Sequence, residues 1–132
     1  MTRMLDHLSL GVRDLARARA FYDAALAPLG YRRGWDVEDA SGYGSPEPHP
    51  LGEQALQFWI GHEPEGAALN GHVCFCARNR AAVDAFHKTA LAAGARDNGG
   101  PGLRSHYHAH YYAAFVVDPD GHRIEAVCHL PE

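Results

Sequence analysis

Four residues in apolar surroundings are the part of this sequence that could do chemistry. His7 lies in the run 7–10 and His72 in the run 72–76, where both are followed by apolar or small residues. Gln57 and Glu125 each interrupt an apolar run, at 56–60 and 124–127. Burying one such side chain costs roughly several kcal/mol unless a partner satisfies its polar atoms. A bound cation would be such a partner for all four.

These four side chains form a donor set that suits a divalent metal. Two imidazoles, a carboxylate and a carboxamide oxygen bind Zn²⁺, Ni²⁺, Mn²⁺ or Fe²⁺, so the sequence does not choose among these ions. With His7, His72 and Glu125 as ligands, positions stay open for water or a small-molecule substrate, and catalysis becomes possible. The alternative is that each residue is a hydrogen-bonded polar residue of the core.

An internal repeat is the reason to consider the four residues together. At an offset of 65, residues 6–14 align with 71–79, and the match continues from 20–22 to 85–87 and from 25–27 to 90–92. The repeat superposes His7 on His72, and a similar offset of 68 relates Gln57 to Glu125. Two duplicated units related by a pseudo-twofold axis would bring both histidines to one central cleft. We predict one domain over 1–132, built from modules at about 1–64 and 65–132.

Each module is predicted to contain one strand, one helix and three further strands, which is an α+β arrangement. In the first module a strand covers 4–12, a helix runs from an Asp14 N-cap to Gly30, and strands follow near 31–36, 40–43 and 55–62. In the second, Asn79 and Gly94 bound the helix, and strands follow near 95–98, 107–118 and 122–129. The segment Asp118-Pro119-Asp120-Gly121 fits a type I turn between the last two strands.

Composition excludes several kinds of partner and site. The formal charge of -4 and a pI near 6.2 leave no basic excess for nucleic acid. No apolar run approaches the ~20 residues that span a bilayer, so no membrane partner is expected. An odd count of three cysteines suits a reducing, cytoplasmic compartment. Cys74 and Cys76 lack the spacing of a zinc or redox pair, and we expect them to be buried packing residues.

The segment 105–112 is the expected wall of a substrate pocket. Strand alternation would place His106, His108, His110 and Tyr112 on one face and Tyr107 and Tyr111 on the other. Arg104, His108 and Tyr112 are the candidates for binding a polar substrate, unless this segment is a solvated edge strand with cross-strand aromatic pairs. Trp59 is two residues from Gln57 and faces the same side, where it either stacks on a substrate or fills the core.

The whole chain resembles the vicinal oxygen chelate superfamily, which includes glyoxalase I, bleomycin and fosfomycin resistance proteins and extradiol dioxygenases. The resemblance lies in residues 6–10, 12–15, 21–22 and 71–73, and most specifically in the ending D-P-D-G-H-R-I-E at 118–125. It implies paired βαβββ modules whose curved sheets form a barrel around a cleft, often completed across a homodimer.

The resemblance also implies a ligand set and a chemistry. The family's metal ligands fall on His7, Gln57, His72 and Glu125, and Glu125 and Gln57 are the expected catalytic residues. In this family a substrate chelates the metal through vicinal oxygens, and the ion acts as a Lewis acid that stabilises an enolate or similar oxyanion. Glu125, or a metal-bound water, would then move the proton.

Three departures from the family pattern bear on the substrate. Glutathione-dependent glyoxalases carry an Arg where this chain has Gly11 and an Asn where it has Gly61, and extradiol dioxygenases carry a Tyr where it has Phe115. We therefore expect a metal-dependent lyase or isomerase of glyoxalase type that acts on a small oxygen-rich molecule other than the glutathione hemithioacetal. The alternatives are a metal-dependent dioxygenase or resistance-type transferase, and a metal-free protein that sequesters a ligand as bleomycin resistance proteins do.

Overall fold

One arrangement of elements occurs twice along the chain. The computed structural model describes residues 4–45, 56–66 and 72–132. The first module contains β1 (Leu8–Val12), α1 (Leu15–Leu26), the short 3-10 helix η1 (Ala27–Leu29), β2 (Arg32–Val37), β3 (Ala40–Gly44) and β4 (Phe58–His62). The second contains β5 (His72–Cys76), α2 (Arg80–Ala92), β6 (Arg96–Asp97), β7 (Gly102–Leu103), β8 (Tyr112–Val117) and β9 (Arg123–Cys128). The predicted α+β class and the βαβββ order are confirmed, with β6 and β7 as two short pieces of one interrupted strand.

The strands form two sheets of matching topology. The first has the order β1-β4-β3-β2, and the second has the order β5-β9-β8-β6 with β7 also paired to β8. In both sheets the first strand of the module pairs in parallel with the last one. Over the described residues the two sheets stay separate, so the predicted pair of curved sheets is present and does not form a closed barrel.

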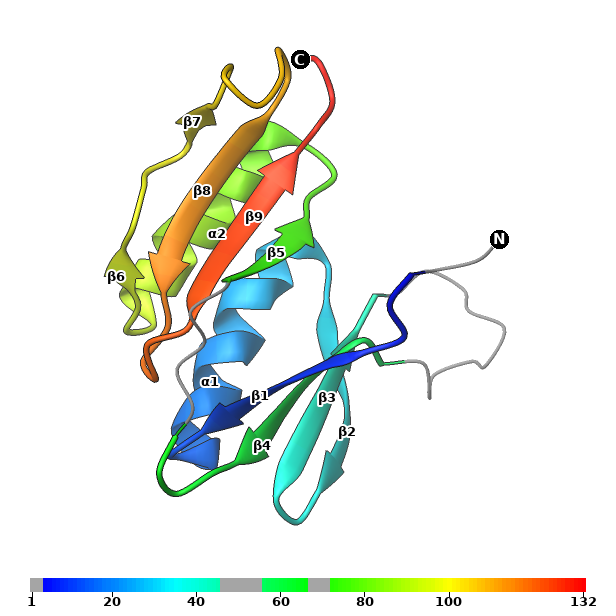
Figure 1. Ribbon diagram of the computed structural model, residues 1–132, viewed down its shortest axis with the longest axis vertical. Coiled ribbons are helices and arrows are strands. Elements are labelled where there is room, and N and C mark those ends of the chain that lie inside the picture. Colours follow the sequence, from blue (N-terminus) through cyan, green and yellow to red (C-terminus); the bar gives the residue numbers. More distant parts are fainter. Residues whose placement is uncertain (1–3, 46–55, 67–71) are drawn as a thin grey trace.

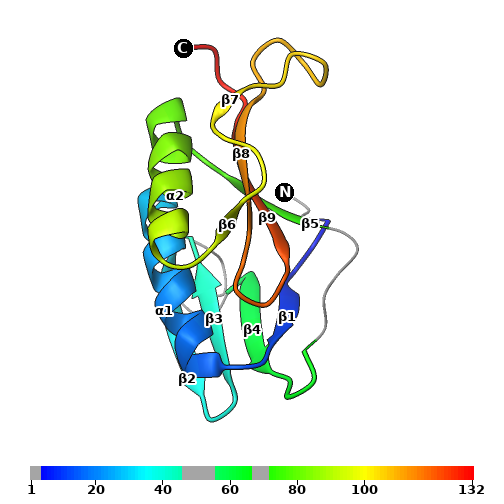
Figure 2. The ribbon, with the colours of Figure 1, turned by 90° about the vertical axis from the view of Figure 1, so that its left-hand side faces the viewer.

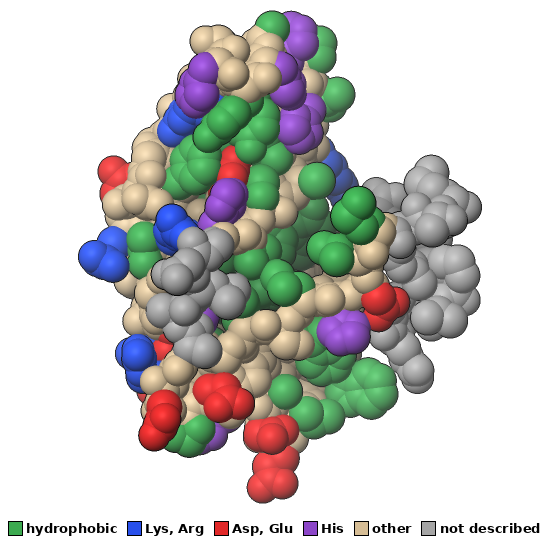
Figure 3. Space-filling view, viewed as in Figure 1, with side chains coloured by type: hydrophobic (Ala, Val, Ile, Leu, Met, Phe, Trp, Pro, Cys, Tyr) green, Lys and Arg blue, Asp and Glu red, His purple; other side chains and the backbone are tan. Residues whose placement is uncertain are grey.

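Helices α1 and α2 lie together on one side of both sheets (Figures 1 and 2). Alternation along the strands turns residues such as Leu10, Ile60, Ile124 and Ala126 toward the helices, where they are at most 2% exposed and belong to one hydrophobic core. The other side of both sheets carries no helix, and we call it the open face. Hydrophobic side chains and histidines gather on this face (Figure 3).

The predicted helix boundaries are confirmed by their capping contacts. The Asp14 carboxylate accepts a hydrogen bond from the Arg17 backbone N–H at 3.0 Å, and Asn79 accepts one from Ala82 at 2.8 Å. After α1 and η1 the chain turns at Gly30 with φ +87°, a left-handed conformation that glycine adopts without a steric penalty. No helix in the described part of the chain is long and apolar enough to cross a membrane.

The segment Asp118–His122 forms the turn between β8 and β9 and also joins the two modules. Asp118 is 3% exposed and accepts hydrogen bonds from the Tyr22 hydroxyl of α1 and from the backbone N–H groups of Asp120 and His122. Gly121 adopts φ +94°, as the predicted turn with a following bulge requires. The hairpin is confirmed. Within the most specific motif of the sequence, residues 118–122 therefore have a structural role.

Two further contacts complete this junction. Asp120 accepts a hydrogen bond from the Arg13 backbone N–H at 2.9 Å, and the Arg17 guanidinium lies 3.4 Å from the same carboxylate. His122 is 1% exposed, and its Nε2 lies 2.8 Å from the carbonyl oxygen of Gly11 in β1. These contacts fix β9, and with it Glu125, relative to the first module.

Candidate functional site

His72 and Glu125 meet on the open face of the second sheet. In the β5–β9 register Cys74 lies opposite Glu125, and His72 precedes Cys74 by one full alternation, so all three share a face. His72 Nε2 lies 3.1 Å from Glu125 Oε1. The Glu125 side chain is only 2% exposed, whereas that of His72 is 52% exposed. A buried carboxylate with an accessible imidazole beside it is a pair of oxygen and nitrogen donors that suits a metal ion.

Tyr111 is the second partner of Glu125, and the sequence analysis missed it. Its hydroxyl donates a hydrogen bond to Glu125 Oε2 at 2.5 Å. Burial, together with the hydrogen bond to Glu125, raises the pKa of Tyr111, so the phenol stays a donor over the physiological range. The sequence does contain a signal for Tyr111. Counting back from the turn pairs Phe115 with Glu125, and Tyr111 is two alternations further along the same face.

The predicted strand at 107–118 is too long, and the face assigned to it was wrong. Only Tyr112–Val117 forms β8, and residues 105–111 form turns. Tyr112 points to the helix side, where its hydroxyl donates to Asp84 at 2.6 Å and the Arg80 guanidinium lies 5.2 Å from the centre of its ring. Tyr111 thus faces the candidate site and Tyr112 does not, because the alternation begins only where β8 pairs with β9.

A pair of conservative substitutions separates these neighbouring tyrosines. Tyr111→Phe removes one of the two hydrogen bonds that orient Glu125, and we expect metal affinity and turnover to fall about tenfold or more. Tyr112→Phe removes a contact to α2 on the other side of the sheet and should leave both quantities near wild type. Metal titration and steady-state rates check this. Equal effects of the two changes would contradict the placement of Tyr111.

Two predicted substrate-binding residues lie at the margin of this cluster. His108 Nε2 lies 2.8 Å from His129 Nδ1, and the His108 ring packs edge-on against Tyr111 at 5.5 Å. Arg104 donates to the carbonyl oxygens of Gly102 and Gly100, and its guanidinium lies 5.2 Å from the centre of the Phe115 ring. Arg104 thus lies beside the cross-strand partner of Glu125, and His108 lies beside Tyr111.

The cysteine prediction was wrong for two of the three residues. Cys74 and Cys76 are exposed on the open face, and only Cys128 is buried, on the helix side. Desolvation, followed by the charge of Glu125, raises the pKa of the Cys74 thiol, so this thiol is protonated beside the carboxylate. The expectation rested on the hydrophobic character of free cysteine, which does not show which face of β5 is covered.

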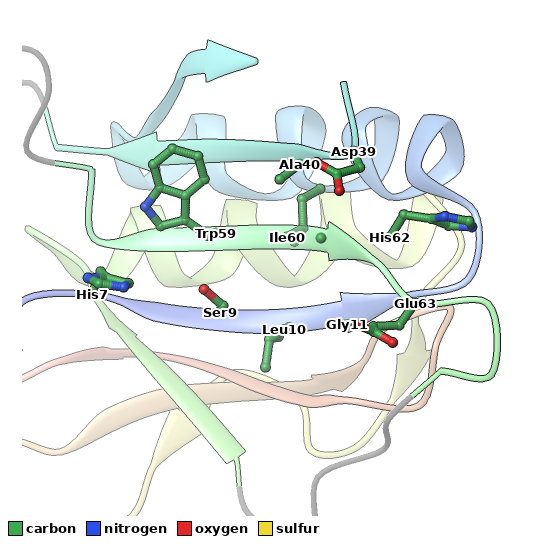
Figure 4. Close-up of a pocket in the computed structure, with 11 residues that line it drawn as sticks. His7, Ser9, Leu10, Gly11, Asp39, Ala40, Trp59, Ile60, His62 and Glu63 are labelled. Atoms are coloured by element: carbon green, nitrogen blue, oxygen red, sulfur yellow. The ribbon is translucent and has the colours of Figure 1, made fainter. Parts of the chain in front are cut away.

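His7 lies on the open face of the first sheet. It lies at one end of a pocket of about 450 Å³, and the other residues that line this pocket include Ser9, Gly11, Trp59 and Gly61 (Figure 4). His7 Nδ1 lies 2.8 Å from a carboxylate oxygen of Asp6, and its side chain is 55% exposed. Trp59 is half-buried and lines this pocket.

The predicted equivalence of Gln57 and Glu125 is wrong by two residues. Ser9 and Cys74 are equivalent in the repeat, and their cross-strand partners are Trp59 and Glu125. Trp59 therefore occupies the place in the first sheet that Glu125 has in the second. Gln57 precedes β4, where its backbone carbonyl accepts a hydrogen bond from Leu8, and it lines a separate hollow with Cys74 and Tyr43. The prediction matched the apolar run around Gln57 to the run around Glu125 by amino-acid composition. Composition does not fix the register in which a strand pairs with its neighbour.

The two halves of the predicted metal set lie on different sheets. His72 and Glu125 fit a metal as adjacent donors, but His7 contacts Asp6 and not this pair. Among residues 4–45, 56–66 and 72–132, no three His, Cys, Asp or Glu side chains lie close enough together to hold a metal ion. The part of the chain that the structure describes therefore supplies the His72–Glu125 pair without a third protein ligand beside it.

Comparison with known proteins gives results at the level of family and fold. A family model described as the Glyoxalase/Bleomycin resistance protein/Dioxygenase superfamily matches residues 4–126. No curated protein matches the chain. The crystal structure of a glyoxalase/bleomycin resistance protein from Albidiferax ferrireducens T118 is similar at 31% identity and a TM-score of 0.81, over 96% of this chain and 99% of that one.

More distant structures share the fold. The fosfomycin resistance protein FosX from Listeria monocytogenes aligns at 17% identity and a TM-score of 0.67, over 98% of this chain and 96% of that one. A mutant of the same protein has been solved with Mn(II) and 1S,2S-dihydroxypropylphosphonic acid, and it aligns at 17% identity and a TM-score of 0.66, over 96% of this chain and 90% of that one. Taken with the family model and the two βαβββ modules, these matches show that the chain belongs to the glyoxalase/bleomycin resistance protein/dioxygenase superfamily.

Proposed function

We propose that this protein is a divalent-metal-dependent lyase or isomerase of glyoxalase type that acts on a small oxygen-rich substrate. The observation that carries the proposal is the Glu125 carboxylate, which is 2% exposed and hydrogen-bonded to His72 and Tyr111, with the Cys74 thiol beside it. A carboxylate in such a position is costly to bury without strong partners. A metal ion together with a proton-transfer role accounts for its presence on an open sheet face.

His72, Glu125 and His7 are the residues proposed to hold the metal. Their imidazole and carboxylate donors suit Zn²⁺, Ni²⁺, Mn²⁺ or Fe²⁺. When bound, the ion would polarise the oxygens of a chelated substrate as a Lewis acid. Gln57, the fourth predicted ligand, has no contact with the other three among the described residues, and we leave it out of the proposed set.

The residues around Glu125 supply orientation and a route for a proton. The Tyr111 hydroxyl and the His72 imidazole hydrogen-bond to the two carboxylate oxygens and hold them in place. A base held in this way accepts a proton from a carbon or oxygen placed within hydrogen-bond reach. Arg104 and His108, at the margin of the cluster, would bind polar groups of the substrate.

We further propose that a homodimer completes the metal site. His7 and the His72–Glu125 pair lie on separate sheets of one chain, and both sheets leave their open face without a helix. Apposing two copies through these faces would bring His7 of one chain to the pair on the other. It would also cover Cys74 and Cys76, which are apolar in character but exposed in the single chain.

The glutathione hemithioacetal is excluded from the proposal by the chemistry of the first sheet. Glycines stand at positions 11 and 61, where an Arg and an Asn would be needed for the carboxylate and amides of glutathione. Both glycines line the pocket beside His7, and the lining residues that the structure describes include no Lys or Arg.

Elemental analysis of the purified protein tests the proposal. We expect about one divalent ion per chain in the wild type and in His87→Ala, a control whose imidazole pairs with Asp97 outside the site. His72→Ala should lose the ion while keeping its fold, because this side chain is half exposed. If the wild type takes up no Zn²⁺, Ni²⁺, Mn²⁺ or Fe²⁺ at saturating concentration, the enzyme proposal fails and metal-free ligand sequestration takes its place.

A dioxygenase is the second candidate, and Tyr111 is the observation that favours it. A tyrosine beside the metal-binding carboxylate is a feature that the resemblance to extradiol dioxygenases implies, and here Tyr111 supplies it from a different position in the sequence. The iron-loaded protein is to be assayed with catechols and with thiol adducts in an oxygen electrode. Oxygen uptake with catechols would favour the dioxygenase, and conversion of a thiol adduct without oxygen uptake would favour the lyase or isomerase.

A further inference from the structure

We infer that the pocket beside His7 is a binding site for a planar ring that carries a positive charge or hydrogen-bond donors, with Trp59 as its stacking platform. The pocket lies on the first sheet, while the proposed base lies on the second. Because His7 is also a proposed metal ligand, the ring would be the part of the substrate that lies beside the metal site, and in assigning the ring to a substrate the inference rests on the proposed function. Binding of the ring itself does not require a metal.

The indole of Trp59 is fixed against the sheet on one side only. A Cβ atom built on Gly42, its cross-strand neighbour, would lie 2.8 Å from Cε2 and Cζ2 of the indole, so the ring lies directly over the bare backbone of β3. The indole Nε1 donates to the carbonyl oxygen of Leu56 at 3.0 Å, which sets the orientation of the ring in its plane. Trp59 remains half-buried, and the remaining surface of the indole is turned to the pocket (Figure 4).

The floor of the pocket is almost free of side chains. Gly11 of β1 and Gly61 of β4 are cross-strand partners, and Ser9 beside Trp59 is small. A Cβ atom on Gly61 would meet its nearest described neighbour, the carbonyl oxygen of Asp39, only at 3.9 Å. The glycine is thus not required by close packing, and its absent side chain leaves room above the sheet. A bare, level floor next to a fixed indole matches a flat ring better than a branched or globular ligand.

The charged groups around the pocket determine which sign of ligand charge is favoured. Asp39 and Glu63 contribute carboxylates, His7 and His62 contribute imidazoles, and no Lys or Arg lines the pocket among the described residues. Figure 4 shows Asp39 and Glu63 at the end of the pocket away from His7. A cation is attracted both by these carboxylates and by the face of an indole. A phosphate, phosphonate or carboxylate ligand would be repelled by both carboxylates, with no Lys or Arg among the described lining residues to offset this.

Three benzene derivatives of nearly equal size test the inference: benzamidine, which is cationic, benzamide, which is neutral, and benzoate, which is anionic. Each is titrated to roughly 10 mM into the metal-free protein, and binding is followed in proton–nitrogen spectra by the shifts of the backbone N–H signals of pocket residues such as Ser9 and Gly61, which are present in every variant. We expect benzamidine to bind most tightly, benzamide more weakly, and benzoate not measurably. Cyclohexanecarboxamidine, which has the same charge without the flat ring, should bind worse than benzamidine.

Matched variants separate stacking from charge. Trp59→Leu keeps an apolar side chain and should weaken benzamidine roughly fivefold to tenfold, while Trp35→Phe, which changes the other, exposed tryptophan of β2, should have no effect. Asp39→Asn should narrow the difference between benzamidine and benzamide without affecting stacking. Asp39 is exposed, so this change should not disturb the fold.

The outcomes either support or overturn the inference, and they do so separately from the metal proposal. Preference for benzamidine that is lost in Trp59→Leu supports it, even if the protein proves to bind no metal. Absence of any shift with all three compounds, equal binding of benzoate and benzamidine, or unchanged binding in Trp59→Leu would overturn it, even if His72 and Glu125 hold a metal.

Discussion

Glu125→Gln is expected to lower metal affinity at least about a hundredfold and to reduce turnover to near the background rate. The amide has the size of the carboxylate but no charge, so it is a poor metal ligand and cannot accept a proton at neutral pH. It also fits its surroundings badly. Tyr111 donates to one oxygen and His72 lies beside the other, and an amide offers an acceptor to only one of them.

The controls for this substitution distinguish chemistry from folding. Glu132→Gln changes an exposed carboxylate that pairs with Arg80, and it should bind metal and turn over as the wild type does. Thermal unfolding of Glu125→Gln checks that the fold persists. A folded Glu125→Gln protein with wild-type metal affinity and rate would show that the buried carboxylate is a structural residue only.

Asp118→Ala is expected to lower the free energy of unfolding by about 3–5 kcal/mol. The change removes the acceptor of three hydrogen bonds at once, from the Tyr22 hydroxyl and from the backbone of Asp120 and His122, and all of these groups are buried or nearly so. Burial, and then the nearby charge of Asp118, raises the pKa of Tyr22, so its hydroxyl stays protonated and would be left without an acceptor.

Two further variants show whether this loss of unfolding free energy comes from the hydrogen bonds of Asp118. Asp118→Asn keeps a carbonyl acceptor and should cost only about 1–2 kcal/mol, and Asp84→Ala, which removes a partner of Tyr112 at the exposed edge of α2, should cost much less than Asp118→Ala. Urea unfolding followed by circular dichroism measures all three. If Asp118→Ala is as stable as Asp84→Ala, the turn is not the junction that we describe.

Much of the fold followed from local patterns in the sequence. The repeat, the N-caps Asp14 and Asn79, the left-handed Gly30 and the β8–β9 turn were predicted correctly because each depends on a few neighbouring residues with a definite backbone preference. The separation of the two sheets over the described residues could not be predicted in the same way. Whether two sheets close depends on their curvature and on what covers them, and neither is encoded in the periodicity of a strand.

The candidate site was predicted in part, and its errors have one physical origin. His72 and Glu125 come together as expected, because the repeat fixes the strands that carry them. Gln57 was misplaced because two apolar runs were matched two residues out of register, and Tyr111 and Tyr112 were misplaced because alternation separates two faces without showing which one meets the site. Register is set by pairing across the sheet, as between Phe115 and Glu125, and composition alone does not reveal it.

The central claim is that His7 from one sheet and the His72–Glu125 pair from another bind one metal ion, with two chains contributing to each site. Mixing His7→Ala chains with Glu125→Gln chains tests this directly, because a dimer with one chain of each kind contains one site with all three donors and one with neither His7 nor Glu125. We predict that each variant alone binds little metal and that the purified mixed dimer binds about one divalent ion and recovers activity. A mixed dimer as empty and inactive as its two parents would contradict the claim.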